Sequence, residues 1–422
     1  MKIKSIKKID YKDDVYNLHI ADNHNYFANN HCVSNCHDFD DVMSNFISIK
    51  ITESVIKRLK FSNEKSIIKD LKKVKTITQY ISFLEELEGE IATTISDVER
   101  SLAFQKRSPK IDKRDNKISK ILNQKNSDSK LMSILSDLSK YQSKIEVFLK
   151  EYKSNPDNWI LETEWNEKTK QSELSLEPIW AYDYLDKYVF SNYDMVFLMS
   201  GTILDKSLFC QLNGLDVDKS VYYSIDSPFD VEKRPIYYMP LGKMSYKQKE
   251  TTFKNYVPYI NKILKKYPDK KGLIHTNSFE LSSWISNELS DPRLVYHDSS
   301  NKDEVLENHK LRDKPTVIVS PSMSTGVSLD NDSARFQIIA KIPYPSLGSK
   351  KNKMRQKMNP DWYSWKTVCG LIQMSGRVVR NNKDWADTII IDGSFSDVLR
   401  YSGHLLPSWF QKAIKRVNVK VA

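Results

Sequence analysis

Residues 231–422 alternate short apolar runs with longer stretches whose apolar residues have helical spacing. The short runs are four or five residues long and contain many β-branched and aromatic residues, which predicts β-strands. They are Pro235–Met239, Gly272–Thr276, Leu294–His297, Val317–Ser320, Phe336–Ala340 and Thr388–Asp392. The predicted helices are Tyr246–Lys265, Glu280–Leu289 and Trp362–Ser375. Strands that alternate with helices predict an α/β fold with a mostly parallel sheet and right-handed crossovers.

The middle of the chain has the pattern of long helices. Ile51–Ser108 contains no proline and only one glycine, and apolar residues recur mostly three or four positions apart up to about Leu149. A basic stretch, Lys106–Lys110, separates two sets of such positions. The pattern predicts an insertion of long antiparallel helices, and a coiled coil is the plainer explanation of the same periodicity. Three tryptophans among polar residues predict extended segments farther on: Trp159, Trp165 and Trp180.

Two further regions have β-type patterns. Within residues 1–35, the runs Val15–Ile20 and Tyr26–Ala28 are separated by a turn, and no long helix is indicated. Met195–Met199 is an apolar run that predicts a buried parallel strand, and it ends in the small residues Ser200–Thr202. Ligand-contacting loops lie at such strand ends in α/β sheets. Gly201 and Thr202 are therefore candidate site residues.

Charge and composition narrow the classes of function. The length of 422 residues predicts two or three domains. A net charge of +11 and a pI near 9.1 favour nucleic acid as a partner over a merely solvated lysine-rich surface. The four cysteines form no C-x-x-C pair, which supports neither a disulfide framework nor a zinc site. Without a long apolar run or a signal-peptide core, we expect a cytoplasmic protein.

Two loops after predicted strands carry polar groups suited to phosphates. Ser320–Val327 is rich in hydroxyl groups, which can hydrogen-bond the phosphates of nucleic acid or of a nucleotide. His275–Ser278 ends another strand and could contact a nucleic-acid backbone. For each loop alone, a structural role explains the pattern at least as well. The candidate nucleic-acid contacts are Ser322, Ser324, Thr325, Thr276 and Asn277.

A third loop, Gln373–Arg380, presents two arginines three positions apart. That spacing puts Arg377 and Arg380 on one side of a helix or turn. Two guanidinium forks suit the charge that develops on a transferred phosphoryl group. The sequence contains no G-x-x-x-x-G-K-[ST], so the phosphate loop of a nucleotide enzyme would have to come from another fragment.

Residues 1–35, followed by Cys36, resemble the C-terminal fragment of a split intein. The matching residues are Val15-Tyr16, His24-Asn25-Tyr26-Phe27-Ala28 and Val33-Ser34-Asn35. The resemblance implies that the Cys36 thiol is the splicing nucleophile and that Asn35 cyclises to cut the bond to Cys36. It also implies that His24 assists proton transfer, with Ser34 at the penultimate position.

One position departs from the intein pattern. Many relatives have an aspartate where Asn17 stands, and that acid helps to activate the cysteine. Splicing could therefore be slower, or it could use Asp14 or Asp22. The plainer alternative for the whole segment is an ordinary β-hairpin with a chance Asn-Cys pair.

The rest of the chain resembles the XPD/DinG group of superfamily 2 DNA helicases. The motifs that carry the resemblance, in order, are Ser200–Thr202, Ser227–Phe229, Ser320–Gly326, Pro343–Pro345 and Gln373–Arg380. The resemblance implies two RecA-like domains with ATP and Mg²⁺ between them, and a helical arch inserted into the first. Together the two resemblances imply these domains: 1–35, the intein fragment; 36–50 with 181–230, the rest of the first RecA-like domain; 51–180, the arch; 231–422, the second RecA-like domain.

The same resemblance assigns roles to single residues. Arg377 and Arg380 would be arginine fingers. Residues that couple the ATP and DNA sites would be Gln373, Gly376, Gly326, Gly201, Thr202 and Thr325. Relatives often have an aspartate where Ser328 stands, and Asp330 is the nearest acid that could replace it. An iron–sulfur cluster, which many relatives hold, would lie in the missing N-terminal half of the helicase.

The two resemblances meet at Cys36. Joining a partner that ends in Asp-Glu to Cys36-His37 would complete a DExH box, in which the acids bind Mg²⁺ and His37 couples the nucleotide to the neighbouring domain. We therefore expect the C-terminal portion of an ATP-dependent DNA helicase, active in DNA repair or replication in the cytoplasm of a bacterial or phage-infected cell. Its partners would be an N-terminal intein–helicase fragment and DNA. The alternatives are a non-enzymatic nucleic-acid-binding protein, and helicase halves that associate without ligation.

Overall fold

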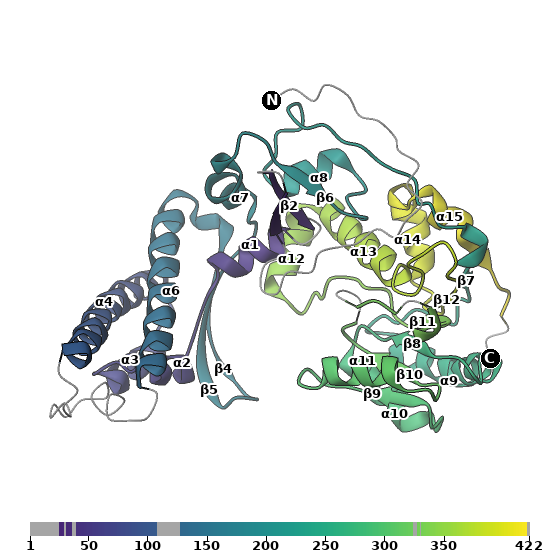
Figure 1. The fold of residues 1–422 in the computed structure, drawn as a ribbon, viewed down its shortest axis with the longest axis horizontal. Helices are drawn as coiled ribbons and strands as arrows, with labels where there is room; N and C mark the ends of the chain where they lie inside the picture. The colour runs from purple at the N-terminus through teal and green to yellow at the C-terminus, as the bar shows by residue number, and fades with distance from the viewer. Residues whose placement is uncertain are drawn as a thin grey trace. The chain divides into compact units, whose positions relative to one another are not determined.

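The computed structural model describes residues 25–28, 31–35, 39–107, 127–323, 327–329 and 331–419. The chain forms two compact units (Figure 1). One, here called the helical unit, is Asp38–Val189. The other, here called the α/β unit, combines Met1–His37 with Phe190–Ala422. The helical unit thus contains the predicted insertion 51–180 together with short segments on both sides of it.

Two long helices and a small sheet build the helical unit. Helices α4 and α6 pack against each other along buried positions such as Leu84, Ile91, Leu138 and Ile145 (Figure 1). The predicted long helices are therefore present. The helices of this unit are α1 (Phe39–Ile47), α2 (Glu53–Leu59), α3 (Glu64–Leu71), α4 (Ile77–Arg107), α6 (Ser127–Ser154), α7 (Tyr182–Tyr188) and the 3₁₀ turn η2 (Pro156–Asn158).

The sheet of the helical unit is antiparallel, in the order β3-β5-β4. Its strands are β3 (Ile49–Thr52), β4 (Trp159–Asn166) and β5 (Gln171–Pro178). Side chains of β5 alternate between buried and partly exposed, as a strand with one covered face requires. Trp159 and Trp165 lie at the beginning of β4 and near its end, so the predicted extended segment is confirmed.

A seven-stranded sheet forms the centre of the α/β unit. Its order is β13-β7-β12-β11-β8-β10-β9, and every pairing is parallel. The strands are β7 (Ile236–Tyr238), β8 (Gly272–His275), β9 (Leu294–Tyr296), β10 (Val317–Ser320), β11 (Phe336–Ile339), β12 (Asp387–Ile390) and β13 (Ile414–Arg416). The predicted parallel α/β sheet is therefore present, and β13 is an addition to it.

Helices cover both faces of this sheet. Helices α9 and α10 pack on one face, for example through Tyr256 and Ile285 against Ile274 and Val317. On the other face, α13, α14 and α15 pack against residues such as Ile339. The helices of this unit are α8 (Lys206–Leu212), α9 (Lys249–Lys266), α10 (Phe279–Glu288), α11 (Lys302–Leu311), α12 (Lys350–Met358), α13 (Pro360–Ser375), α14 (Phe395–Ser402) and α15 (Ser408–Ala413). Its 3₁₀ turns are η3 (Phe190–Asn192), η4 (Val231–Lys233), η5 (Asn331–Ser333) and η6 (Gly403–Leu405).

The strand order reverses between β8 and β11. From β8 the chain passes to β9 and β10 on one side, and it then returns to β11 on the other. In open α/β sheets, ligands bind outside the carboxyl ends of the strands at such a reversal. The loops that follow β8, β10 and β11 all leave from this edge. They include the predicted loops 275–278 and 320–327.

A second, three-stranded sheet joins the N-terminal segment to the run around residue 197. Strands β1 (Asn25–Ala28) and β2 (His31–Asn35) pair antiparallel, and β2 pairs parallel with β6 (Phe197–Met199). The prediction of a parallel strand at β6 is confirmed. The prediction that it is buried is wrong for Phe197 and Met199, which are 37% and 55% exposed, because β6 lies at the edge of the sheet.

Candidate functional site

The loop after β6 and helix α13 contact each other through Thr202 and Gln373. The side-chain amide of Gln373 donates to the Thr202 hydroxyl at 3.2 Å. One helical turn earlier, the Cys369 thiol donates to the Thr202 carbonyl oxygen at 3.2 Å. Another turn earlier, the Trp365 indole donates to the Ile203 carbonyl oxygen at 2.9 Å. Two predicted site residues 171 positions apart are thus in direct contact.

The conformation of this loop comes from its own hydroxyl groups. The Ser200 hydroxyl accepts from the Thr202 backbone N–H at 3.2 Å, and the two hydroxyl groups lie 3.1 Å apart. Thr202 is 3% exposed. Gly201, unlike the buried Thr202, borders open space, because a Cβ atom placed there would meet no other atom within 4 Å. Among the described residues, packing therefore gives no reason for glycine at this position, whereas close approach of a ligand would.

The two predicted arginine fingers converge on one acceptor. Arg377 Nη1 donates to the Val327 carbonyl oxygen at 3.0 Å, and Arg380 Nη2 approaches the same oxygen at 3.4 Å. The expectation that both lie on one side of a helix or turn is confirmed. They follow the end of α13 at Ser375, and the Gly376 N–H closes that helix by donating to the Ile372 carbonyl oxygen.

Two buried valines hold the arginines in place. Val378 and Val379 are 1% and 5% exposed and pack with Met323, Val327 and Leu329 in one apolar cluster. Their burial fixes the backbone between the two arginines, so the guanidinium groups leave the cluster on its polar side. The Leu329 N–H also donates to the Arg377 carbonyl oxygen at 3.1 Å. The described residues of the loop after β10 are thus packed against and hydrogen-bonded to the segment that carries the arginine pair.

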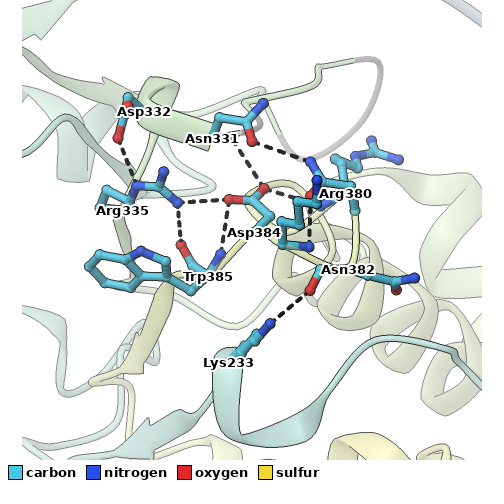
Figure 2. A network of polar contacts seen from close by, with 10 residues as sticks. Lys233, Asn331, Asp332, Arg335, Arg380, Asn382, Asp384 and Trp385 are labelled. Carbon is cyan, nitrogen blue, oxygen red and sulfur yellow. Dashed lines mark hydrogen bonds and ion pairs between the residues drawn. The ribbon is translucent and has the colours of Figure 1, made fainter. Parts of the chain in front are cut away.

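A buried carboxylate fixes the chain just beyond Arg380 (Figure 2). Asp384 accepts from the backbone N–H of Asn331 at 3.1 Å and of Arg380 at 3.3 Å. It also accepts from Arg335 Nη1 at 2.8 Å and from the Trp385 N–H at 2.9 Å. The charge of Arg335 and these donors compensate the loss of water around the carboxylate. The sequence did not single out Asp384 or Arg335.

The loop after β8 contains Thr276 and Asn277. Thr276 is fully buried, and its hydroxyl group lies 2.7 Å from that of Ser282, so in this structure it is not at the surface. Asn277 has a φ of 46°, the left-handed region that asparagine tolerates better than most residues. Its amide donates to the Lys341 carbonyl oxygen at 2.6 Å. Asn277 therefore joins the ends of β8 and β11 where the strand order reverses.

The loop after β10 is only partly described. Ser320 Oγ accepts from the backbone N–H of Ser322 and Met323, and His297 Nε2 lies 2.7 Å from it. Ser322 and Ser328 are exposed. The predicted contacts Ser324, Thr325 and Gly326, and also Asp330, lie outside the described residues.

Gln337 is a positioning residue that the sequence prediction missed. It is fully buried within the otherwise apolar strand β11. Its amide donates to the Ser375 carbonyl oxygen at 3.2 Å and to the Thr388 hydroxyl at 2.8 Å, and its Oε1 lies 3.1 Å from His275 Nε2. It thus ties the end of α13 to three strands. A single polar residue in a strand buried on both faces is the signal that could have revealed it.

Two further predicted motifs have structural contacts. Arg234 donates from Nη2 to Ser227 Oγ at 2.9 Å and to the Phe229 carbonyl oxygen at 3.0 Å, and it stacks 3.9 Å from the Trp409 ring centre. Burial lowers its pKa to about 10, so it stays charged. Helix α13 packs closely on the other motif, since a Cβ atom at Gly370 would lie 3.1 Å from Pro343. Pro343 follows β11 at the sheet edge where the loops gather, whereas Arg234 precedes β7 and holds the other motif at the opposite edge.

The predicted splicing residues are described in part. Strand β2 ends at Asn35, and its backbone lies in register with Met199 of β6. Ser34 is also on β2, and the side chains of both residues lie outside the described part of the chain. His24, Cys36 and His37 lie outside the described residues.

A comparison with protein-family models finds a match. Residues 260–413 match the helicase C-terminal domain family. No curated protein matches the chain. Within the described part, no helix is long and apolar enough to cross a membrane, and no cluster of three or more His, Cys, Asp or Glu residues could hold a metal ion.

Three solved structures resemble the chain over 91% of its length. One is an XPD helicase, with a TM-score of 0.50, 14% identity and 67% of that chain covered. The second is S. tokodaii Xpd4, with a TM-score of 0.50, 13% identity and 74% covered. The third is an apo form of XPD, with a TM-score of 0.55, 15% identity and 76% covered. Residues 260–413 of the α/β unit are therefore similar to helicase C-terminal domains, and the chain has the fold of XPD helicases.

Proposed function

We propose that this chain is the C-terminal portion of an ATP-dependent DNA helicase, which becomes active after it is joined to a fragment that carries the phosphate loop. The observation that carries the proposal is the hydrogen bond between Thr202 and Gln373. It links the loop after β6 to the helix that leads into Arg377 and Arg380. A conformational change in the loop after β6 can therefore be transmitted through helix α13 to the segment that carries Arg377 and Arg380, and the reverse also holds.

The residues around this contact fit one wall of a nucleotide site. Gly201 leaves open space beside the loop, and two guanidinium groups point at a single acceptor. In the proposal, Arg377 and Arg380 exchange the Val327 carbonyl oxygen for phosphate oxygens, which are stronger acceptors. ATP, when bound, supplies a phosphoanhydride bond for hydrolysis. The carboxylates for Mg²⁺ would come from the Asp-Glu end of the partner.

The joining step in the proposal is protein trans-splicing at Asn35 and Cys36. The Cys36 thiolate would attack the partner's thioester and release the partner's intein half. The Asn35 side-chain nitrogen would then attack the Asn35 carbonyl, which forms a succinimide and frees the amine of Cys36. The acyl group would finally move from sulfur to this amine, which leaves an ordinary peptide bond.

The register of β2 and β6 supports this placement. Asn35 is paired with Met199, and parallel strands end at the same edge of a sheet. Strand β2 therefore ends at the same edge as β6, where the Ser200–Thr202 loop starts. After ligation, an Asp-Glu-Cys36-His37 sequence would begin beside that loop.

A direct experiment tests the joining step. A reading frame that ends in an intein N-terminal half after Asp-Glu, with G-x-x-x-x-G-K-[ST] upstream, would be expressed together with this chain. Mass spectrometry should show a product that keeps Cys36 and lacks residues 1–35. Cys36→Ala should block ligation, and Asn35→Ala should accumulate the branched intermediate. Strand displacement by unligated halves would contradict the splicing requirement and support association alone.

A further inference from the structure

Three lysines meet at a pocket of about 330 Å³ in the helical unit. The pocket lies where the C-terminal end of α1, strands β3 and β5, and helix α6 come together. Its polar lining includes Lys50, Lys140, Lys144, Tyr141 and Glu177. None of these residues belongs to the loops described above, and all of them lie within one compact unit.

Lys144 forms the inner wall of the pocket. Its ammonium group donates to the carbonyl oxygens of Asn45 at 2.9 Å and Ser48 at 2.6 Å, so it caps the end of α1. An ammonium group has three donors, and these contacts use two of them. No ion pair of Lys144 is found among the described residues. Burial and the neighbouring Lys140 lower its pKa to about 8, which an anion in the pocket would reverse.

The other charges determine which anion fits. Lys50 pairs with Glu173, and its carbonyl oxygen accepts from the Tyr141 hydroxyl at 3.1 Å. Three lysines against the carboxylates of Glu173 and Glu177 leave one net positive charge. A phosphodiester carries one negative charge, whereas a free phosphate group carries nearly two at neutral pH. The pocket therefore matches a backbone phosphate better than a free one.

We propose that this pocket binds a phosphodiester group of a nucleic-acid backbone, with Lys140 and the remaining donor of Lys144 as its contacts. The phosphate chemistry follows from the pocket itself, while the choice of nucleic acid rests on the proposed function. Lys140 is exposed at the rim, and Lys144 lies deeper. The helical unit would thus supply a phosphate contact separate from those predicted for the α/β unit.

The test compares Lys140→Gln with Lys153→Gln in the full chain. Lys153 is also exposed and lies on the same helix, about 20 Å farther along. Binding of a labelled oligothymidylate is measured without ATP over a range of chloride concentrations. Lys140→Gln should weaken binding about three- to tenfold at low salt and reduce the salt slope by about 0.7, the value for one phosphate of a single strand. Affinity and slope equal to those of Lys153→Gln would overturn the proposal.

A second measurement separates the two sources of phosphate. Inorganic phosphate is titrated at constant ionic strength while the melting temperature is followed. The contrary outcome is that phosphate raises the melting temperature of the wild type but not of Lys140→Gln, while Lys140→Gln and Lys153→Gln bind oligothymidylate equally well. In that case the pocket binds free phosphate, and the nucleic-acid assignment fails. Because neither measurement needs ATP, an inactive ligated product would count against the helicase proposal alone.

Discussion

Replacing Asp384 with alanine should destabilise the α/β unit by about 3 kcal/mol. The Asp384 side chain is 0% exposed and pairs with Arg335, which is 12% exposed. It also accepts from the backbone N–H groups of Asn331 and Arg380. Alanine removes all of these acceptors at once and leaves the guanidinium group of Arg335 with fewer partners in a dry environment.

The expected loss of stability depends on the contacts that Arg335 retains after Asp384 is removed. Breaking a buried ion pair costs about 3–5 kcal/mol when the remaining charge has no other partner. Here Arg335 still donates to Asp332 at 3.0 Å and to the Trp385 carbonyl oxygen at 2.9 Å. We therefore expect the lower end of that range. The matched control is Asp332→Ala, because Asp332 binds the same arginine but its side chain is 92% exposed; it should cost less than about 1 kcal/mol.

Hydrogen exchange across a urea series can follow the two units separately by mass spectrometry of their peptides. With a slope of about 3 kcal/mol per molar urea, Asp384→Ala should lower the midpoint of peptides around β11 and β12 by about 1 M. Peptides from α4 and α6 serve as an internal reference and should not shift. Equal midpoints for Asp384→Ala and Asp332→Ala would refute the argument that burial decides the cost.

Three further predictions concern the same unit. Burial lowers the pKa of His275 and His309 to about 4, so between about pH 6.5 and 4 the unfolded chain binds protons that the folded chain does not. As the pH is lowered through that window, the free energy of unfolding should decrease by about 1 kcal/mol per pH unit for each histidine, which urea midpoints would show. Gln373→Ala and Thr202→Val should each cost about 1 kcal/mol, and the double variant should cost less than their sum in a thermodynamic cycle. Arg377→Ala in the ligated product should abolish ATP hydrolysis while largely sparing DNA binding, and unchanged turnover in a steady-state assay would contradict its role.

The parallel sheet could be predicted because strands covered on both faces need continuous apolar runs. Val317–Ser320 and Phe336–Ile339 are such runs, and their ends agree with the prediction within one residue. Strand β13 was missed because Ile414–Arg416 is short, lies at an edge and carries two basic residues. Edge strands often carry charge, which weakens the pattern that identifies a strand.

The site was harder to predict than the sheet. The spacing of Arg377 and Arg380 was enough to place them on one side, because that is a local property of the chain. The contact between Thr202 and Gln373 joins residues 171 positions apart, and no local pattern contains that pairing. The buried partners Asp384 and Gln337 were missed because a polar residue in the sequence does not show whether folding will bury it.

The splicing and helicase proposals constrain each other at β6. In this chain the neighbour of β6 is β2, which belongs to the segment that splicing would remove. Ligation would therefore take away one neighbour of β6 and bring in a segment that ends in Asp-Glu at the same place. Phe197 and Met199, now 37% and 55% exposed, would gain cover from the rest of the partner domain. Because Gln373 holds Thr202 at the end of this strand, completing the sheet would also fix the loop that α13 connects to the arginine pair.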